Sequence, residues 1–172
     1  MSQQHVIVKE FISNAVYRMD ECSRMIEIAF EHLSEDDLWK RPNEKSNSIG
    51  NLILHLCGNI TQYAIASLGE TKDERQRDIE FSSTSGYTKK DLIRKLMDTV
   101  SVAKDVISNA TEEQLLKKRE VQGFYFSGLG NVLHVVEHYS YHTGQIAFYT
   151  KILKKSSLGF YDGINLNTKN KE

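Results

Sequence analysis

Apolar residues recur at spacings of three and four along most of this chain of 172 residues, and few stretches alternate with a period of two. Such spacing places apolar side chains on one face of a helix, whereas a half-buried strand alternates with a period of two. The pattern predicts four long helices, over residues 5–33, 47–69, 88–109 and 128–154. Four long helices joined by connectors predict an all-α protein, a four-helix bundle.

The connections carry further information about how the helices are arranged. Residues 70–86 are charged and then rich in Ser and Gly, and we expect them to form a long loop between helices two and three. A loop of this length can run the length of the bundle, so neighbouring helices need not alternate in direction. Residues 119–130 are expected to turn the chain before the last helix. We expect one domain over residues 1–155 and a weakly ordered C-terminal tail over residues 156–172.

Composition excludes several classes of function. The net charge is −1, so nothing indicates nucleic acid or an acidic membrane surface as a partner. Cys22 and Cys57 lie far apart in the sequence, which argues against a disulfide framework and favours reduced thiols in a cytoplasmic protein. The first residues lack a basic start followed by an apolar core, so no secretory signal is expected.

The second and fourth predicted helices differ from the other two in charge. Residues 46–69 contain no charged side chain, and residues 121–150 contain only Glu137. Uncharged helices are usually buried on most sides. A membrane span is not expected for the second helix, because it carries too many polar groups and lacks aromatic anchors at its ends.

Polar residues on each of these two helices lie on one face of the helix. At about 100° per residue, one arc of roughly 80° on the second helix contains five polar side chains. These are Ser48, Asn51, His55, Asn59 and Gln62. One arc on the fourth helix likewise contains His134, His138, His142, Gln145 and Tyr149. A solvated stripe would carry Lys or Glu, so these neutral groups indicate a partly buried polar site between two facing helices.

The histidine spacing allows a metal site. Two histidines four residues apart on a helix lie about 6 Å apart and can bind one divalent ion. The alternative is that they are core histidines, hydrogen-bonded to nearby Tyr, Ser and Asn. His134 and His142 are separated by about 12 Å along the axis, so they cannot easily bind the same ion. Only one adjacent pair is expected to bind metal; His138 belongs to both pairs, and His55 is the best candidate for a third ligand.

Two segments, "SNSIGNLILHLCGNITQY" and "LHVVEHYSYHTGQI", together with "LWKRP" before the second helix, resemble the DinB-like superfamily of bacterial four-helix proteins. The resemblance covers roughly residues 5–154. It implies a bundle of up-down-down-up topology, which agrees with the long connection at residues 70–86.

The resemblance also implies which histidines bind the metal. Matched to the superfamily's motifs, with the Gly144–Gln145 pair setting the register, the ligands are His55, His138 and His142. His134 becomes a supporting residue. Many relatives carry Arg after the last ligand, where this chain has Thr143, which can change contacts to an anionic substrate or a neighbour.

Several functions are compatible with such a site. Three neutral imidazoles leave the charge of the ion uncompensated and coordination positions open, as in catalytic sites, and they suit zinc, nickel or iron. The leading hypothesis is an enzyme that activates a low-molecular-weight thiol for transfer to a small electrophile, as some DinB-like proteins do. A hydrolase using metal-bound water is an alternative, weakened because no carboxylate base is apparent. A non-catalytic metal-binding or interaction protein is another.

Supporting groups and partners complete the hypothesis. Asn59, Gln62, Gln145 and Tyr149 share the arcs of the candidate ligands and are expected to orient groups at the site. The expected partner is a small-molecule substrate, and the superfamily favours a homodimer.

Overall fold

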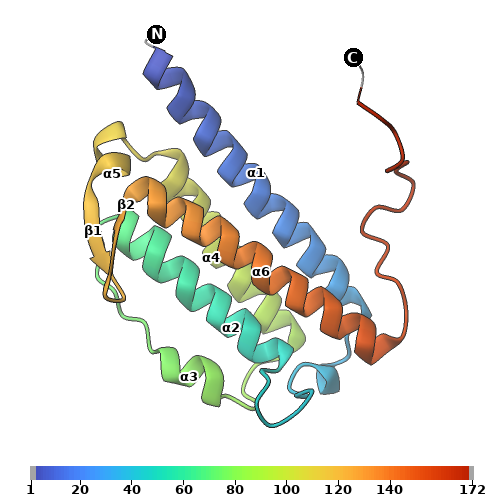
Figure 1. Cartoon of the computed structure of the whole chain (residues 1–172). Coiled ribbons are helices and arrows are strands. Elements are labelled where there is room, and N and C mark those ends of the chain that lie inside the picture. The colour runs from blue at the N-terminus through green and yellow to red at the C-terminus, as the bar shows by residue number, and fades with distance from the viewer. Residues whose placement is uncertain (1–2, 171–172) are drawn as a thin grey trace.

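Four long helices form a bundle in the computed structural model, which describes residues 3–170 (Figure 1). These helices are α1 (Gln3–His32), α2 (Ile49–Ile60), α4 (Lys89–Ser108) and α6 (Gly128–Lys154). The helix begun by α2 continues to residue 68 as a wider π-helix, η2 (Thr61–Leu68). The prediction of an all-α four-helix bundle is confirmed, with each long helix within a few residues of its expected bounds.

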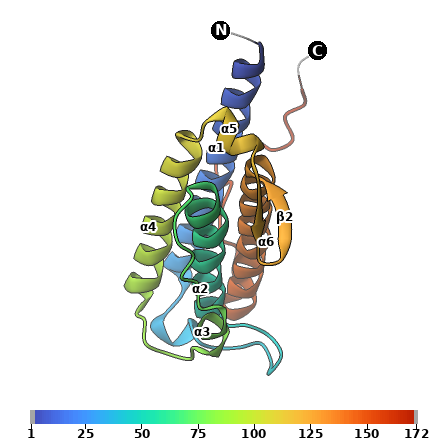
Figure 2. The same cartoon turned by 90° about the vertical axis from the view of Figure 1, so that its left-hand side faces the viewer.

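The helices have the up-down-down-up order. In Figures 1 and 2, α2 and α4 run in one direction while α1 and α6 run in the other. Because α2 and α4 are parallel, the chain between them must return along the side of the bundle before α4 begins. This return segment lies against α2 and, as shown below, contributes to the candidate site.

Polar side chains define where the long helices begin. Ser48 accepts a hydrogen bond from the backbone N–H of Asn51 at the start of α2, and Thr88 does the same for Asp91 at the start of α4. These bonds satisfy backbone donors that have no partner inside a helix. Ser48 and Thr88 therefore mark the positions at which α2 and α4 begin.

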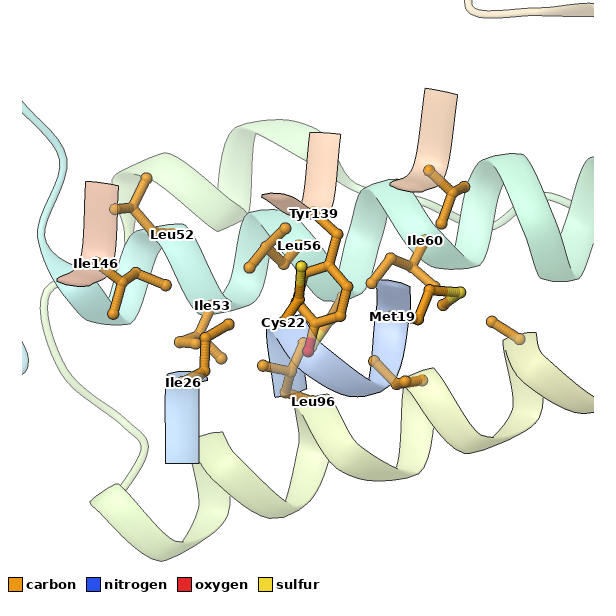
Figure 3. Packing of buried hydrophobic residues seen from close by; sticks show 14 of the residues in the cluster. Met19, Cys22, Ile26, Leu52, Ile53, Leu56, Ile60, Leu96, Tyr139 and Ile146 are labelled. Atoms are coloured by element: carbon orange, nitrogen blue, oxygen red, sulfur yellow. The ribbon is translucent and has the colours of Figure 1, made fainter. Parts of the chain in front are cut away.

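The core lies between all four helices (Figure 3). Met19 of α1, Leu56 of α2, Leu96 of α4 and Tyr139 of α6 are fully buried there. The Tyr139 hydroxyl is paired with the Ser23 hydroxyl at 3.0 Å, which satisfies the one polar atom of that ring. No helix within residues 3–170 is long and apolar enough to cross a membrane.

Both cysteines are buried free thiols in this core. Burial raises the pKa of the Cys57 thiol to about 11. A thiol that stays protonated is a poor nucleophile, so Cys57 acts as a core residue.

Two connections differ from expectation. Residues 70–86 are not a loop throughout, because α3 (Arg77–Ser82) forms within them and packs on α2. The turn expected at residues 119–130 contains a two-stranded antiparallel hairpin, β1 (Lys118–Val121) and β2 (Phe124–Ser127). Both differences arise in short elements that are stabilised by contacts with the bundle and carry too few residues to show a period.

The remaining short elements lie at the ends of the bundle. They are η1 (Glu35–Asp37), a single turn after α1, and α5 (Glu112–Leu116), before the hairpin. Residues 156–170 contain no helix, although Leu158 is buried and the Arg24 guanidinium donates to the carbonyl of Phe160 at 2.9 Å. The division into a domain and a weakly ordered tail stays a prediction.

Asp37 of η1 ties the end of α1 to the end of α6. Its buried carboxylate accepts hydrogen bonds from the backbone and hydroxyl of Ser34, from Lys40 and from Lys154. Burial by itself would raise the pKa of this carboxyl. The bonds from Lys154, Ser34 and Lys40 outweigh burial and hold its pKa well below the usual range.

We therefore expect Asp37→Asn to lower the free energy of unfolding by about 2 kcal/mol at pH 7, because it removes charge-assisted bonds to a buried group. Urea unfolding followed by circular dichroism measures this loss. Asp36→Asn, at the exposed neighbouring position, is the control and should change stability little. Since the folded pKa is depressed, the difference should narrow as the pH falls below about 4. Equal stability of the two variants would contradict this role for Asp37.

Candidate metal centre

Three histidines converge between α2 and α6. One ring nitrogen from each of His55, His138 and His142 lies within 4.8 Å of the other two. The Nε2 atoms of His55 and His138 are 2.9 Å apart. Two nitrogens bound to one tetrahedral ion lie about 3.3 Å apart, given metal–nitrogen bonds of about 2 Å. The separation of His55 from His138 is slightly shorter than that value, and no pair in the group is more than 4.8 Å apart, so small movements of the rings would bring all three onto one ion.

The protonation state of the cluster suits a cation. Burial, together with the neighbouring histidines, lowers the pKa of His138 to about 3. Burial and the nearby His55 lower the pKa of His142 to about 4, although its hydrogen bond with Gln145 acts in the opposite direction. Both rings are therefore neutral at pH 7. Neutral imidazole is the form that binds metal, because the ligating nitrogen must carry a free lone pair.

Gln145 orients the ring of His142. The Nδ1 atom of His142 lies 2.7 Å from the side-chain oxygen of Gln145. An amide oxygen only accepts, so Nδ1 carries the proton and donates it. The lone pair of His142 is then on Nε2. Gln145, expected as a supporting group, is thus in contact with a candidate ligand.

The corresponding partner of His55 comes from the return segment and was missed from the sequence. The Nδ1 atom of His55 lies 2.9 Å from Oε2 of Glu80, a buried residue of α3. Arg75 forms two hydrogen bonds to the same carboxylate, at 2.7 and 2.8 Å. Charged residues in a predicted loop are usually solvated, so the sequence did not indicate that Glu80 and Arg75 are buried. The available signal was Gly58, since a glycine inside a helix can mark a close approach by another segment.

His134 lies one turn before His138 and outside the cluster. Its ring stacks on Tyr63, with 4.0 Å between centroids, and on His138 at 5.3 Å. Its Nε2 atom accepts a hydrogen bond from the side-chain amide of Asn59 at 3.1 Å. His134 and Asn59 therefore form a polar layer beside the cluster. Within residues 3–170, the buried amide oxygen of Asn59 has no hydrogen-bond partner.

The other expected supporting residues lie further away. Gln62 bonds to Asp73 and Arg75, so it reaches the histidines only through Arg75. Tyr149 lies two turns beyond His142. Burial raises the pKa of its hydroxyl, and the charges that act on it are those of Lys40 and Asp37.

Thr143, where this chain departs from the motif that the resemblance implies, follows His142 on α6. Its side chain is buried, and its hydroxyl donates to the Tyr139 carbonyl one turn earlier at 2.8 Å. The same hydroxyl lies within hydrogen-bonding reach of the buried Cys22 thiol of α1, so Thr143 contributes to the contact between α6 and α1.

Comparison with known proteins agrees with this architecture. Residues 6–161 match the model of a family described as "Protein of unknown function (DUF1572)". The crystal structure of a DinB-like protein from Bacillus subtilis, YjoA, is similar, with a TM-score of 0.61 and 20% sequence identity. The similarity covers 84% of this chain and 91% of that chain. At this identity it establishes the DinB-like fold, as the sequence motifs predicted. A search of curated protein sequences finds no significant match.

The lowered histidine pKa values predict how metal-free protein responds to acid. As the pH falls below about 6.5, the unfolded chain binds protons at His138 and His142 that the folded protein does not. Stability should therefore fall between pH 6.5 and 4, by about 1 kcal/mol per pH unit for each ring. Urea midpoints measured with a chelator at several pH values test this.

A substitution distinguishes the contribution of the buried histidines to this pH dependence from that of other acid-sensitive groups. His138→Gln should make the dependence on pH shallower, whereas His32→Gln, at the exposed end of α1, should keep the wild-type slope. Equal slopes for wild type and His138→Gln would show that the buried cluster does not control acid sensitivity.

Proposed function

The chain belongs to the DUF1572 family and has the DinB-like fold, and from this premise we propose that it binds a divalent metal ion to activate a low-molecular-weight thiol. The thiolate sulfur then forms a bond to a small electrophile, which releases its leaving group. His55, His138 and His142 are the proposed ligands, and zinc, nickel or iron suits three imidazoles. The convergence of one ring nitrogen from each of these three residues, all within 4.8 Å of one another, is the observation that carries the proposal.

Charge favours an anionic ligand at this site. The proposed ligands are neutral imidazoles, and the charge of Glu80 beside them is balanced by Arg75. The protein therefore leaves the double positive charge of a divalent ion uncompensated. Such an ion, when bound, supplies a Lewis acid that lowers the pKa of a thiol and holds it as thiolate.

The protein's own residues orient and shield the site. Gln145 and Glu80 fix two of the rings by hydrogen bonds to the nitrogen that faces away from the cluster. His55 and His142 are buried, whereas His138 is partly exposed. The small-molecule substrate should therefore approach from the side of His138.

Hydrolysis receives less support from the same geometry. A general base needs a free lone pair within reach of the proton it accepts. Glu80 is the buried carboxylate beside the histidines, and both of its oxygens already accept bonds from Arg75, one of them also from His55. A thiol that binds the ion releases its proton to solvent, because the ion lowers its pKa. Thiol transfer therefore needs no carboxylate base and fits better. The homodimer and the cytoplasmic location stay predictions.

The first test is metal content. Protein purified without a histidine tag should contain close to one divalent ion per chain, as measured by inductively coupled plasma mass spectrometry. His138→Gln should lose most of it, because two imidazoles bind a divalent ion far more weakly than three. His134→Gln is the matched control one turn away and should retain the metal. Equal metal content in both variants would show that the cluster is not the site.

The second test is turnover. Holoprotein incubated with a panel of small thiols and monochlorobimane should form the thioether at least tenfold faster than His55→Ala. Ester or amide turnover without thiol would favour the hydrolase instead. A protein that binds metal and shows neither reaction would favour the non-catalytic alternative.

A further inference from the structure

A buried ion pair lies directly behind His55. The Arg75 and Glu80 side chains are 3% and 8% exposed, so water does not screen them. Arg75 donates from Nε to Oε1 of Glu80 at 2.7 Å and from Nη2 to Oε2 at 2.8 Å. This two-point contact fixes the plane of the carboxylate as well as its position.

Further bonds hold Arg75 in place. Its Nη1 atom donates to the side-chain oxygen of Gln62 at 2.8 Å. The Gln62 amide nitrogen donates to Asp73 at 2.6 Å, and Asp73 accepts the backbone N–H of Arg75 at 3.0 Å. The return segment is therefore bonded to η2 through a closed ring of three residues. Arg75 has little freedom to leave Glu80.

The contacts determine which nitrogen of His55 carries the proton. Its Nδ1 atom lies 2.9 Å from Glu80 Oε2 and 3.1 Å from Arg75 Nη2. Arg75 donates to both oxygens of the Glu80 carboxylate, with which it forms an ion pair, so Oε2 faces His55 as a carboxylate oxygen. An ionised oxygen only accepts, so Nδ1–H must donate to it. Arg75 Nη2 is close to Nδ1 because both donors converge on the same oxygen.

Gly58 makes this arrangement sterically possible. It lies three residues after His55 on α2, at the point where Glu80 crosses the helix. A Cβ atom at residue 58 would lie 2.0 Å from Glu80 Oε1 and 2.8 Å from Arg75 Nε. Any side chain at this position would push the carboxylate away from His55. Gly144 of α6 offers a contrast, because a Cβ there would have no atom within 4 Å.

We propose that Glu80 and Arg75 are positioning residues of the metal site, with Gly58 providing the space through which they reach it. Arg75 fixes Glu80, and Glu80 holds His55 with its proton on Nδ1, so that the Nε2 lone pair faces His138 and His142. This proposal rests on the proposed metal binding for its purpose. The hydrogen-bonded state of His55 itself exists with or without metal.

Two measurements on the full chain test it. Nitrogen-15 NMR of metal-free protein reports which ring nitrogen of His55 is protonated, with the signal assigned by its loss in His55→Gln. Competition with a chromophoric chelator gives the Kd for zinc. Urea unfolding shows that each variant is folded under the conditions used.

We expect the wild type to hold His55 with Nδ1 protonated. Glu80→Gln should give a mixture of the two ring forms and raise the Kd for zinc by about 10- to 100-fold, which is typical for loss of a carboxylate behind a ligating histidine. Gly58→Ala should do the same without changing any hydrogen-bonding group. Gly144→Ala is the matched glycine control and should leave both readouts at wild-type values.

The outcomes separate this proposal from the proposed function. If the wild type binds no zinc, metal binding fails, and the NMR result alone decides whether Glu80 positions His55. If the wild type binds zinc while Gly58→Ala and Glu80→Gln keep both its Kd and its His55 proton position, metal binding stands and the positioning role is wrong. Because Gly58→Ala leaves both Glu80 and Arg75 in the chain, it supplies the test should Glu80→Gln fail to fold.

Discussion

The contact between the uncharged faces of α2 and α6 is the interaction on which the rest of the structure depends. Burying polar side chains costs free energy unless each one finds a partner. Here His55, Asn59, His134 and His142 are brought into contact with one another or with nearby amides and carboxylates. The charged helices α1 and α4 can cover this pair because their apolar faces complete the core around it.

The sequence predicts the bundle well because long helices repeat their apolar spacing many times. It also indicates the two histidine-bearing helices, since the absence of charge over more than twenty residues is a strong signal of burial. The hairpin at residues 118–127 and α3 are too short for a period to be seen. Helical rise narrows the choice of histidines but leaves two pairs open. The resemblance to the DinB-like superfamily selects His138 and His142, and the three-dimensional contacts bring these two together with His55.

The residues behind the cluster are harder to predict than the cluster itself. Gln145 is found because it lies on the same helical arc as His142, whereas Glu80 comes from another segment altogether. Its spacing from His55 in the sequence carries no periodic signal. A carboxylate held by arginine in a dry environment also behaves unlike the solvated charge that its sequence context suggests. It acts as a fixed acceptor and is not free to take up a proton.

The parallel course of α2 and α4 has a consequence for how such a protein can diversify. A bundle with alternating helices needs only tight turns, and every residue near its centre must then belong to a core helix. The long return segment here lies outside the four long helices. Its residue Glu80 still reaches His55 at the centre, because Gly58 leaves space for it. Substitutions in residues 70–86 can therefore change the hydrogen bonds and charges around His55 without changing any residue of the four long helices.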